Sequence, residues 1–350
     1  MSYSPPFQIN NKIIEQVARI AELTGKISAS ANLERNPTLR RKNRILTIQG
    51  SLAIEQNSLT LEQITDVING KTVLAPPKDI KEVKNAYEIY ENLHLLNPFS
   101  CDDLLNAHGV MMKGLLNDAG EFRDHPVGVA DSSTGQIIHF GTLPDYVPEM
   151  VVSLLKWTEE SDVHMLIKSC VFHYEFELIH PFSDGNGRIG RLWHTLLLFS
   201  WNPVFAFLPI ESMIYKKQQE YYKTINYCND AADSTRFIEF MLDTVTDTMS
   251  SAVTTTDQVS DQDTDQDTDQ DNDQDNDQVT DNITKLLSAL GTSELSASEL
   301  MSRLGLSHKP TFRKNYLSPA LEKGVIERTV PDKPTSKNQK YRIRRYVSSE

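Results

Sequence analysis

The stretch HPFSDGNGRIGR at residues 180–191 lies between two apolar helical patterns and decides what kind of domain this chain forms. The apolar residues of 163–174 recur at helical spacing, and 192–199 is apolar nearly all round, which is typical of a central buried helix. A short polar turn would be enough to join two such helices. A junction that holds a histidine, an aspartate, two glycines around an asparagine and two arginines therefore predicts a binding site on a helical body.

The residue types of this junction predict an anion site. Gly185 and Gly187 allow the backbone to approach a phosphate closely. The following helix is expected to begin near Asn186, so that its free N–H groups and positive dipole end face the ligand. Arg188 and Arg191 are three residues apart and can bind further phosphate oxygens.

Two residues of the junction predict chemistry. Asp184 would be repelled by a phosphate unless a cation lay between them, which indicates a Mg²⁺ ligand. His180 ends the preceding helix, where a neutral imidazole could take a proton from an attacking hydroxyl. By contrast, His173 and His194 lie on apolar helix faces without a second His or Cys at helical spacing. They predict packed side chains and not a transition-metal site.

The pattern His-Pro-Phe-x-Asp-Gly-Asn-Gly-Arg-x-x-Arg at 180–191 resembles the signature of the Fic family at every position. The resemblance covers about residues 1–250 and implies a mainly α fold, in which a helical domain carries a β-hairpin flap before the signature. It also implies transfer of AMP from ATP to a Ser, Thr or Tyr hydroxyl of a protein target. Mg²⁺ would be required, and pyrophosphate would leave.

Carried over by position, the resemblance implies that His180 is the general base, that Asp184 is the metal ligand and that Phe182 is a core residue. It implies an anion hole at 185–187, with Asn186 at the α-phosphate, followed by two phosphate-binding arginines of which the second binds the γ-phosphate. Relatives that transfer a plain phosphoryl group carry lysine at the second glycine, so Gly187 favours nucleotide transfer. The residues expected at ATP are Asp184, Gly185, Asn186, Gly187, Arg188, Ile189, Gly190, Arg191, Val127, Gly128, Val129, Ala130 and Tyr222.

Residues 120–141 predict the flap, because glycines and prolines bracket two short β-prone pieces at 127–129 and 137–140. An exposed edge at Val127–Ala130 could hold a target segment by strand addition. The alternative is a plain surface hairpin. Tyr222 and its neighbour Tyr221 lie where family members often line the adenine pocket, although paired tyrosines on a helix are more often core residues.

Upstream, the segment SLAIEQN at 51–57 resembles the inhibitory motif of Fic proteins, Ser/Thr-x-x-x-Glu followed by Gly or Asn. The resemblance implies that Glu55 pairs with Arg191 and holds the triphosphate of ATP out of line for attack. Gln56 departs from the motif, although Asn57 follows at once. The alternative is an ordinary exposed glutamate on an amphipathic helix. The direction in which the Glu55 side chain points depends on where that helix ends.

Charge divides the 350-residue chain into regions. The net charge is −13, but 257–281 holds eleven aspartates and no Lys or Arg, whereas 282–350 holds thirteen Lys and Arg against six acids. The repeat of Asp, Gln, Thr and Asn has nothing apolar to bury and predicts a disordered tether. Four regions are expected: a helical region at 1–100 with the inhibitory helix around 40–57, the Fic catalytic core at 101–250, an acidic disordered linker at 251–281, and a winged helix-turn-helix domain at 282–350.

The C-terminal region is assigned from three short helical patterns followed by two β-prone pieces, the order of a small winged helix-turn-helix domain. Such domains are often appended to Fic proteins. Binding of DNA and docking of a protein are equally open for it. The side chains expected to contact DNA phosphates are Lys309, Arg313, Lys314, Lys337, Lys340 and Arg342.

Three cysteines without paired spacing exclude a disulfide framework and point to a reducing compartment. No apolar run reaches membrane-spanning length and the N-terminus lacks a signal-peptide pattern, so we expect a cytoplasmic protein without a membrane partner. The sequence therefore predicts an autoinhibited adenylyltransferase that uses ATP and Mg²⁺, with a homodimer left open. Two rivals are a DNA-binding regulator whose Fic body senses nucleotide, and an enzyme that removes AMP from a modified protein.

Overall fold

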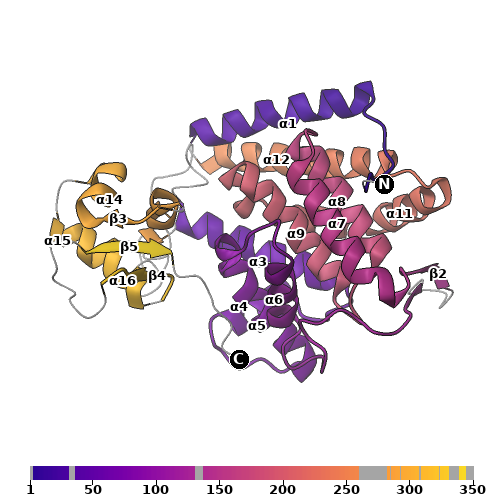
Figure 1. Cartoon of the computed structure of the whole chain (residues 1–350), viewed down its shortest axis with the longest axis horizontal. Coiled ribbons are helices and arrows are strands. Elements are labelled where there is room, and N and C mark those ends of the chain that lie inside the picture. Colours follow the sequence, from indigo (N-terminus) through magenta and orange to yellow (C-terminus); the bar gives the residue numbers. More distant parts are fainter. Residues whose placement is uncertain are drawn as a thin grey trace. The chain divides into compact units, whose positions relative to one another are not determined.

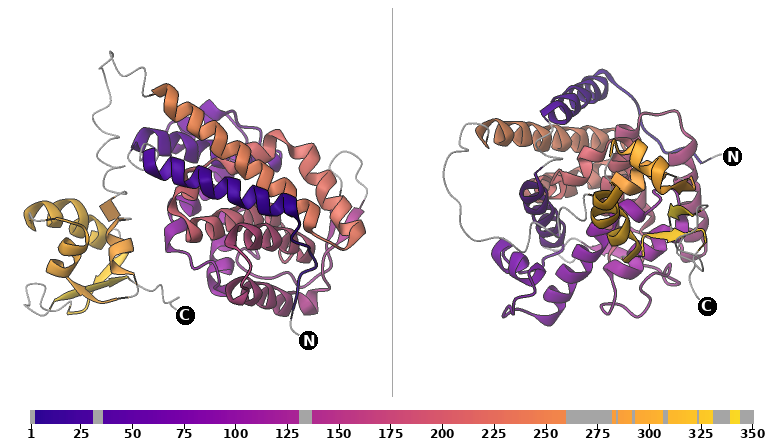
Figure 2. Two further views of the ribbon diagram at one scale, coloured as in Figure 1. Left: turned by 90° about the horizontal axis from the view of Figure 1, so that it is seen from above. Right: turned by 90° about the vertical axis from the view of Figure 1, so that its left-hand side faces the viewer.

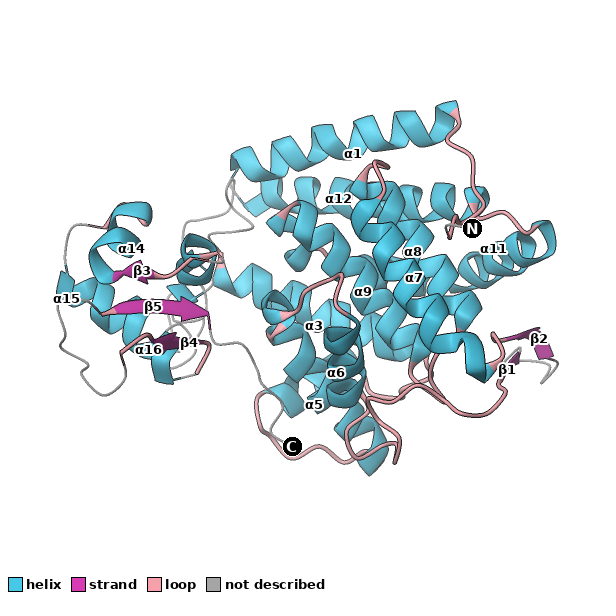
Figure 3. Cartoon of the chain, viewed as in Figure 1, coloured by secondary structure: helices cyan, strands magenta, loops and turns pink. Residues whose placement is uncertain are grey.

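The computed structural model of the chain describes residues 3–30, 36–130, 137–259, 282–283, 285–291, 293–306, 309–322, 324–330 and 339–343. They fall into two compact units, divided between residues 263 and 264. Helices form most of the described residues (Figure 3), which confirms the expected mainly α fold. Among these residues, no helix is both long and apolar enough to cross a membrane.

The first unit is a body of helices with one β-hairpin (Figure 1). Short 3-10 helices occur at Leu93–Leu95, Pro144–Tyr146 and Pro203–Phe207. The α-helices are α1 (Asn11–Ser30), α3 (Pro37–Ile54), α4 (Leu61–Ile68), α5 (Pro77–Glu91), α6 (Cys101–Met111), α7 (Val147–Glu160), α8 (Met165–Ile179), α9 (Asn186–Trp201), α10 (Ile210–Lys216), α11 (Gln218–Ala231) and α12 (Thr235–Val259).

Helices α8 and α9, which flank the junction at 180–185, form the centre of this unit. All residues from Leu166 to Phe176 in α8 and from Arg188 to Leu198 in α9 are buried. Helices that are apolar nearly all round must be covered on every side. Helix α8 packs against α9, α7 and α12, and α9 also contacts α3 and α6. Helix α1 lies beside α12 and covers it (Figure 2). The junction is therefore fixed at the ends of two fully packed helices.

The predicted hairpin is present. Strands β1 (Gly128–Ala130) and β2 (Ile137–Phe140) are antiparallel, with Gly128 opposite Phe140 and Val129 opposite His139. The first strand begins one residue later than the predicted piece 127–129. Residues 131–136 lie outside the described part of the chain.

Helix α3 ends at the point where the inhibitory motif departs from the family pattern. Gln56 adopts a left-handed conformation with φ 66°, and its N–H donates to the Ala53 oxygen at 3.0 Å. The Asn57 N–H donates to the Leu52 oxygen at 3.1 Å. These two bonds form a Schellman motif, in which the left-handed residue is usually Gly or Asn. Gln56 therefore stops the helix as the usual residue would, and Glu55 is its C-cap residue.

Helix α12 is longer than the sequence predicted. It continues to Val259, nine residues into the segment 251–281 that was expected to be an unstructured linker. Ala252 and Val253 pack against the core, which explains why the helix does not stop at 250. The rest of the linker, 260–281, lies outside the described residues.

The second unit has a small sheet and short helices. Strands β3 (Leu295–Ser296), β5 (Lys340–Ile343) and β4 (Ile326–Arg328) pair antiparallel in that order. Helical residues at 285–290 precede α14 (Ala297–Arg303), α15 (Lys309–Phe312), the π-helix Arg313–Leu317 and α16 (Ser318–Glu322). The order of helices and then a strand pair agrees with the expected one, while the third strand, β3, was not foreseen. Assignment as a winged helix stays a prediction.

The conformation of Gln56 generates a prediction about stability. A left-handed conformation costs a residue other than glycine roughly 1–2 kcal/mol, and the greater unfolded freedom of glycine offsets about 0.5–1 kcal/mol of that cost. We therefore expect Gln56→Gly to raise the free energy of unfolding of the first unit by about 0.5–1 kcal/mol. Urea unfolding followed by tryptophan fluorescence measures this directly, because all three tryptophans lie in the first unit.

The matched control is Ala232→Gly, because Ala232 is also left-handed, with φ 49°, at the end of α11. We expect a similar gain there. If Ala232→Gly raises the free energy of unfolding and Gln56→Gly does not, the left-handed conformation of Gln56 does not reduce stability. That result would contradict the prediction.

Candidate active site

His180 lies at the turn that follows α8, and its backbone is held in place by one buried arginine. Its own conformation is left-handed, with φ 53°, and its N–H donates to the Phe176 oxygen at 2.9 Å. Arg123 donates from Nε to the His180 oxygen at 2.7 Å and from Nη2 to the Ile179 oxygen at 3.3 Å. Arg123 thus caps the carbonyl end of α8. Arg123 lies within the segment 120–141 that was predicted to form the flap, and no local sequence pattern reveals this contact.

The imidazole of His180 is oriented by Glu177, one turn earlier in α8. Nδ1 lies 3.3 Å from the Glu177 backbone oxygen and 4.0 Å from its carboxylate Oε2. These contacts favour the tautomer that carries its proton on Nδ1, in which Nε2 has the lone pair that a general base needs. The side chain is 19% exposed, so it is accessible from one side. Burial raises the pKa of Glu177 to about 7, so its charge varies near neutral pH.

The loop between the two central helices is fixed by Asn186 and Phe182. The Asn186 side chain accepts from the Phe182 N–H at 2.9 Å and donates to the Phe182 oxygen at 2.8 Å. Both polar atoms of this buried amide are thus used within the loop. The resemblance implied Asn186 at the α-phosphate; the side chain is bonded within the loop, so its backbone N–H and the second hydrogen on Nδ2 are the donors left for such a contact, which stays a prediction.

Phe182 is a core residue, as expected, and it stacks on His108 with ring centroids 3.7 Å apart. The Gly120 N–H donates to His108 Nδ1 at 2.9 Å, so Nε2 carries the proton and donates to the Asp184 oxygen at 3.0 Å. Burial lowers the pKa of His108, which keeps the ring neutral. His108 therefore positions the loop from α6, and no sequence pattern indicated this role.

The first turn of α9 leaves room for backbone approach only because its glycines lack side chains. Gly185 has φ 87°, and a Cβ there would meet Met112 Sδ at 2.8 Å. A Cβ on Gly187 would collide with Glu55 Oε1 and would meet Arg191 Nη1 at 2.9 Å. The free N–H groups at the start of this 16-residue helix are where the sequence predicts the anion site.

Ile189 and Gly190, which were expected among the ATP-binding residues, face the core. Ile189 is fully buried, and a Cβ on Gly190 would meet Glu177 Oε1 at 2.9 Å. Ile189 therefore cannot reach a ligand with its side chain, and Gly190 is needed for close packing of α9 on α8.

Asp184 has the position and exposure of a ligand for one metal ion. Its side chain is 50% exposed, and Oδ1 accepts from the Gly185 N–H at 2.6 Å. Mg²⁺ is usually held by one or two carboxylates, substrate phosphates and waters, so a single accessible carboxylate beside an anion site fits it. No group of three or more His, Cys, Asp or Glu side chains that could hold a metal ion occurs among the described residues.

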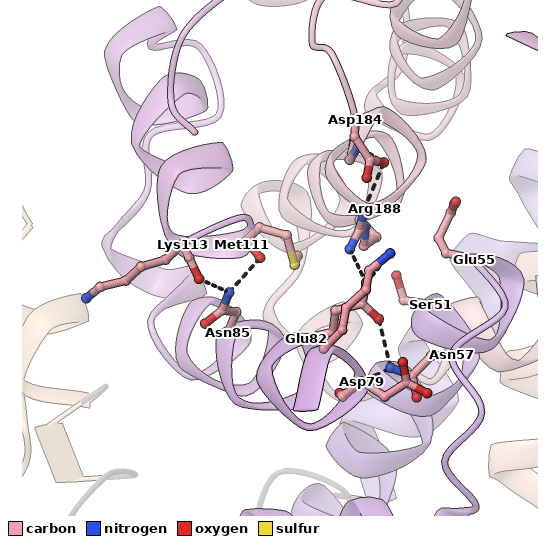
Figure 4. Close-up of polar contacts among 12 residues, drawn as sticks. Ser51, Glu55, Asn57, Asp79, Glu82, Asn85, Met111, Lys113, Asp184 and Arg188 are labelled. Carbon is pink, nitrogen blue, oxygen red and sulfur yellow. Dashed lines mark hydrogen bonds and ion pairs between the residues drawn. The ribbon is translucent and has the colours of Figure 1, made fainter. Parts of the chain in front are cut away.

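Arg188 is buried between two carboxylates (Figure 4). Nη2 lies 3.1 Å from Asp184 Oδ1, and Nη1 lies 3.1 Å from Glu82 Oε1 on α5. The side chain is 3% exposed. The resemblance implied a direct phosphate contact, but here the charge of Arg188 is already compensated and the side chain orients Asp184.

Arg191 makes the contact with Glu55 that the sequence predicted. Nη2 donates to Glu55 Oε1 at 2.7 Å and to the Ser51 backbone oxygen at 3.1 Å. The arginine side chain is 1% exposed, whereas that of Glu55 is 31% exposed. Burial lowers the pKa of Arg191, but the Glu55 carboxylate together with Tyr221 and Tyr222 raises it above its usual value.

The two tyrosines of α11 play different structural roles. Tyr221 is buried, and its hydroxyl lies 3.0 Å from His173 Nε2, so it is a core residue. Tyr222 is 38% exposed, and burial of its hydroxyl raises its pKa to about 12. Only Tyr222 is therefore accessible to a ligand. His173 and His194 are packed in the core as expected, and burial lowers the pKa of His194 to about 3.

The flap is tied to the end of α8. The Gly141 N–H donates to the Val127 oxygen, and the Thr142 N–H donates to the Ile179 oxygen, both at 3.1 Å. The residue before His180 is therefore bonded directly to the end of the hairpin. Gly128 is exposed on β1.

Four of the six basic residues expected to contact DNA, Lys309, Arg313, Lys340 and Arg342, are exposed on the second unit. Arg342 on β5 pairs with Glu327 at 2.7 Å and with Glu294 at 3.0 Å. Lys337 and the side chain of Lys314 lie outside the described residues. DNA binding by this unit stays a prediction.

Comparison with known proteins gives two family matches. The Fic/DOC family matches residues 98–198, and the family described as "Filamentation induced by cAMP protein Fic-like, C-terminal domain" matches residues 281–344. A curated relative, the protein adenylyltransferase fic-1 of Caenorhabditis briggsae, is 28% identical over 227 residues. That similarity covers 60% of this chain and 42% of the relative, so the chain spans less than half the length of that protein.

Solved structures extend the similarity to the whole chain. A Fic family protein from Desulfovibrio desulfuricans G20 is 44% identical, with a TM-score of 0.71 over 99% of this chain and 100% of that one. A Fic domain containing signaling protein from Bacteroides thetaiotaomicron VPI-5482 has a TM-score of 0.57 at 19% identity, over 71% of this chain and 97% of that one. The latter similarity shows the fold alone.

Proposed function

This chain belongs to the Fic family, and we propose that it is a protein adenylyltransferase that moves AMP from ATP to a Ser, Thr or Tyr hydroxyl of a protein target. The observation that carries the proposal is the position of His180, which is oriented through Nδ1 beside the free N-terminus of α9. A base and an anion site on one loop are what attack on a phosphate ester requires.

In the proposed reaction, His180 Nε2 takes the proton of the target hydroxyl while the hydroxyl oxygen attacks the α-phosphorus of ATP. A new P–O bond forms, the bond to the bridging oxygen of the β-phosphate breaks, and pyrophosphate leaves. The N–H groups at the start of α9 stabilise the negative charge on the phosphate. Bound Mg²⁺, held by Asp184, would supply further neutralisation of the phosphate charge.

We further propose that the chain is autoinhibited by Glu55. Arg191 is the arginine that the family resemblance assigns to the γ-phosphate, and Glu55 already forms an ion pair with it. ATP could still enter the site, but Glu55 would keep its γ-phosphate away from Arg191. The α-phosphorus would then not be in line with the attacking hydroxyl. The closeness of Glu55 Oε1 to the Gly187 backbone supports this, because the carboxylate lies beside the helix start that is proposed to bind the phosphates.

The two rival functions predict different results with labelled ATP. Transfer predicts incorporation of label into protein, nucleotide sensing predicts bound ATP without turnover, and AMP removal predicts release of AMP from a modified target. A cytoplasmic location stays a prediction from the sequence.

For the base, we expect His180→Ala to lower self-labelling and target labelling by about 10²–10⁴, because that is the usual contribution of a general base. ATP affinity should persist, since the phosphate contacts belong to other residues. Labelling by radioactive ATP and calorimetry of ATP binding measure the two quantities. The control is His125→Ala, whose ring is 54% exposed. Near wild-type labelling by His180→Ala would exclude His180 as the base.

For inhibition, we expect Glu55→Gly to raise the rate of self-labelling roughly tenfold to a hundredfold, because a hydrogen bond between charged groups contributes about 1.5–3 kcal/mol. Glu55→Gln keeps the side chain's volume and removes its charge, so it separates charge competition from bulk. We expect both variants to show most of the increase in the self-labelling rate. Equal rates in the wild type and both variants, with ATP bound by all three, would contradict autoinhibition by Glu55.

A further inference from the structure

Glu82 on α5 joins two parts of the site that are far apart in sequence. Its Oε1 accepts from Arg188 Nη1 at 3.1 Å, and its Oε2 accepts from Asn57 Nδ2 at 2.8 Å (Figure 4). Its side chain is 6% exposed. One buried carboxylate therefore bonds both to the arginine that holds Asp184 and to the residue that closes the end of α3.

Asn57 is held in place by hydrogen bonds of both its backbone and its side chain. Its backbone N–H is part of the Schellman motif that ends α3, two residues after Glu55. Its side-chain Nδ2 also donates to the Asp79 backbone oxygen at 3.2 Å, and its Oδ1 accepts from the Leu59 N–H at 3.1 Å. The position of Glu55 thus depends on where Asn57 is held.

Separating Glu82 from Arg188 would cost free energy because both side chains are charged and buried. A buried carboxylate that loses its only close cation keeps the full cost of desolvation. The other cation near Glu82, Lys78, is 3.9 Å away and largely exposed, so it compensates little. Arg188 is therefore kept on Glu82, and its second amino group stays on Asp184.

We propose that Glu82 is a positioning residue that couples the inhibitory end of α3 to the Asp184–Arg188 pair. The coupling runs through hydrogen bonds of 2.8, 3.1 and 3.1 Å, from Asn57 to Glu82, Arg188 and Asp184. One carboxylate thus fixes the positions of Glu55 and Asp184 relative to each other. The consequence for inhibition rests on the proposed function, whereas the structural coupling does not.

Hydrogen exchange of the backbone tests the coupling without any need for activity. Glu82→Met keeps the volume and removes both acceptors, so we expect exchange to accelerate roughly threefold to tenfold at both 52–57 and 184–189. Asn57→Ala breaks only one end and should accelerate exchange at 52–57 alone. The matched control is Asn85→Ala, because the buried Asn85 is also on α5 but its Nδ2 donates to the Met111 and Lys113 oxygens. It should change neither segment.

If Glu82→Met does not fold, Glu82→Gln serves instead. Both partners of Glu82 are donors, and an amide offers one acceptor and one donor, so it must give up at least one of them. Faster exchange confined to α5 in a folded Glu82 variant, or the same pattern in Asn85→Ala, would overturn the proposal.

Labelling tests the consequence for inhibition. We expect Asn57→Ala to raise self-labelling roughly threefold to tenfold in the wild-type background and to change nothing in a Glu55→Gly background. An equal rise in both backgrounds would overturn the link to Glu55. If no variant labels any protein, the proposed function fails, while the exchange pattern still decides whether Glu82 couples the two segments.

Discussion

The buried charge of Arg191 is the constraint on which the rest of the site depends. A cation that is 1% exposed needs a counter-charge at all times, and Glu55 supplies it from another helix. The ion pair requires α3 to end beside α9, which Gln56 achieves by adopting a left-handed conformation. It also requires glycine at 187, because any larger residue would collide with the Glu55 carboxylate. A triphosphate that reaches Arg191 must therefore take the place of Glu55.

The loop between α8 and α9 is held both by partners from other elements and by bonds within itself. Arg123 holds the carbonyls at the end of α8, His108 holds the Asp184 oxygen, and Asn186 closes the loop on itself. Glu82 adds a connection from this loop to the end of α3. His180, Asp184 and Glu55, the proposed base, metal ligand and inhibitory carboxylate, are thus held in fixed relative positions.

The sequence predicted what local patterns and short motifs encode. Residues 180–191 located the site, helical periodicity located α8 and α9, and the motif at 51–57 predicted the pairing of Glu55 with Arg191. Arg123, His108 and Glu82 could not be found, because each acts on residues more than fifty positions away and resembles any other polar residue locally. The use of the Asn186 side chain within its own loop, and the extension of α12 to Val259, depend on packing that periodicity does not encode.

The central claim is that Glu55 and the γ-phosphate compete for Arg191, and the comparison of ATP with ADP affinity tests it most directly. Calorimetry with Mg²⁺ present gives both affinities for the wild type and for Glu55→Gly, without any need for turnover. The account predicts that the wild type binds ATP and ADP equally within about twofold, and that Glu55→Gly prefers ATP by about tenfold or more, since it regains a hydrogen bond between charged groups. A wild-type chain that prefers ATP by the same factor as Glu55→Gly would contradict it.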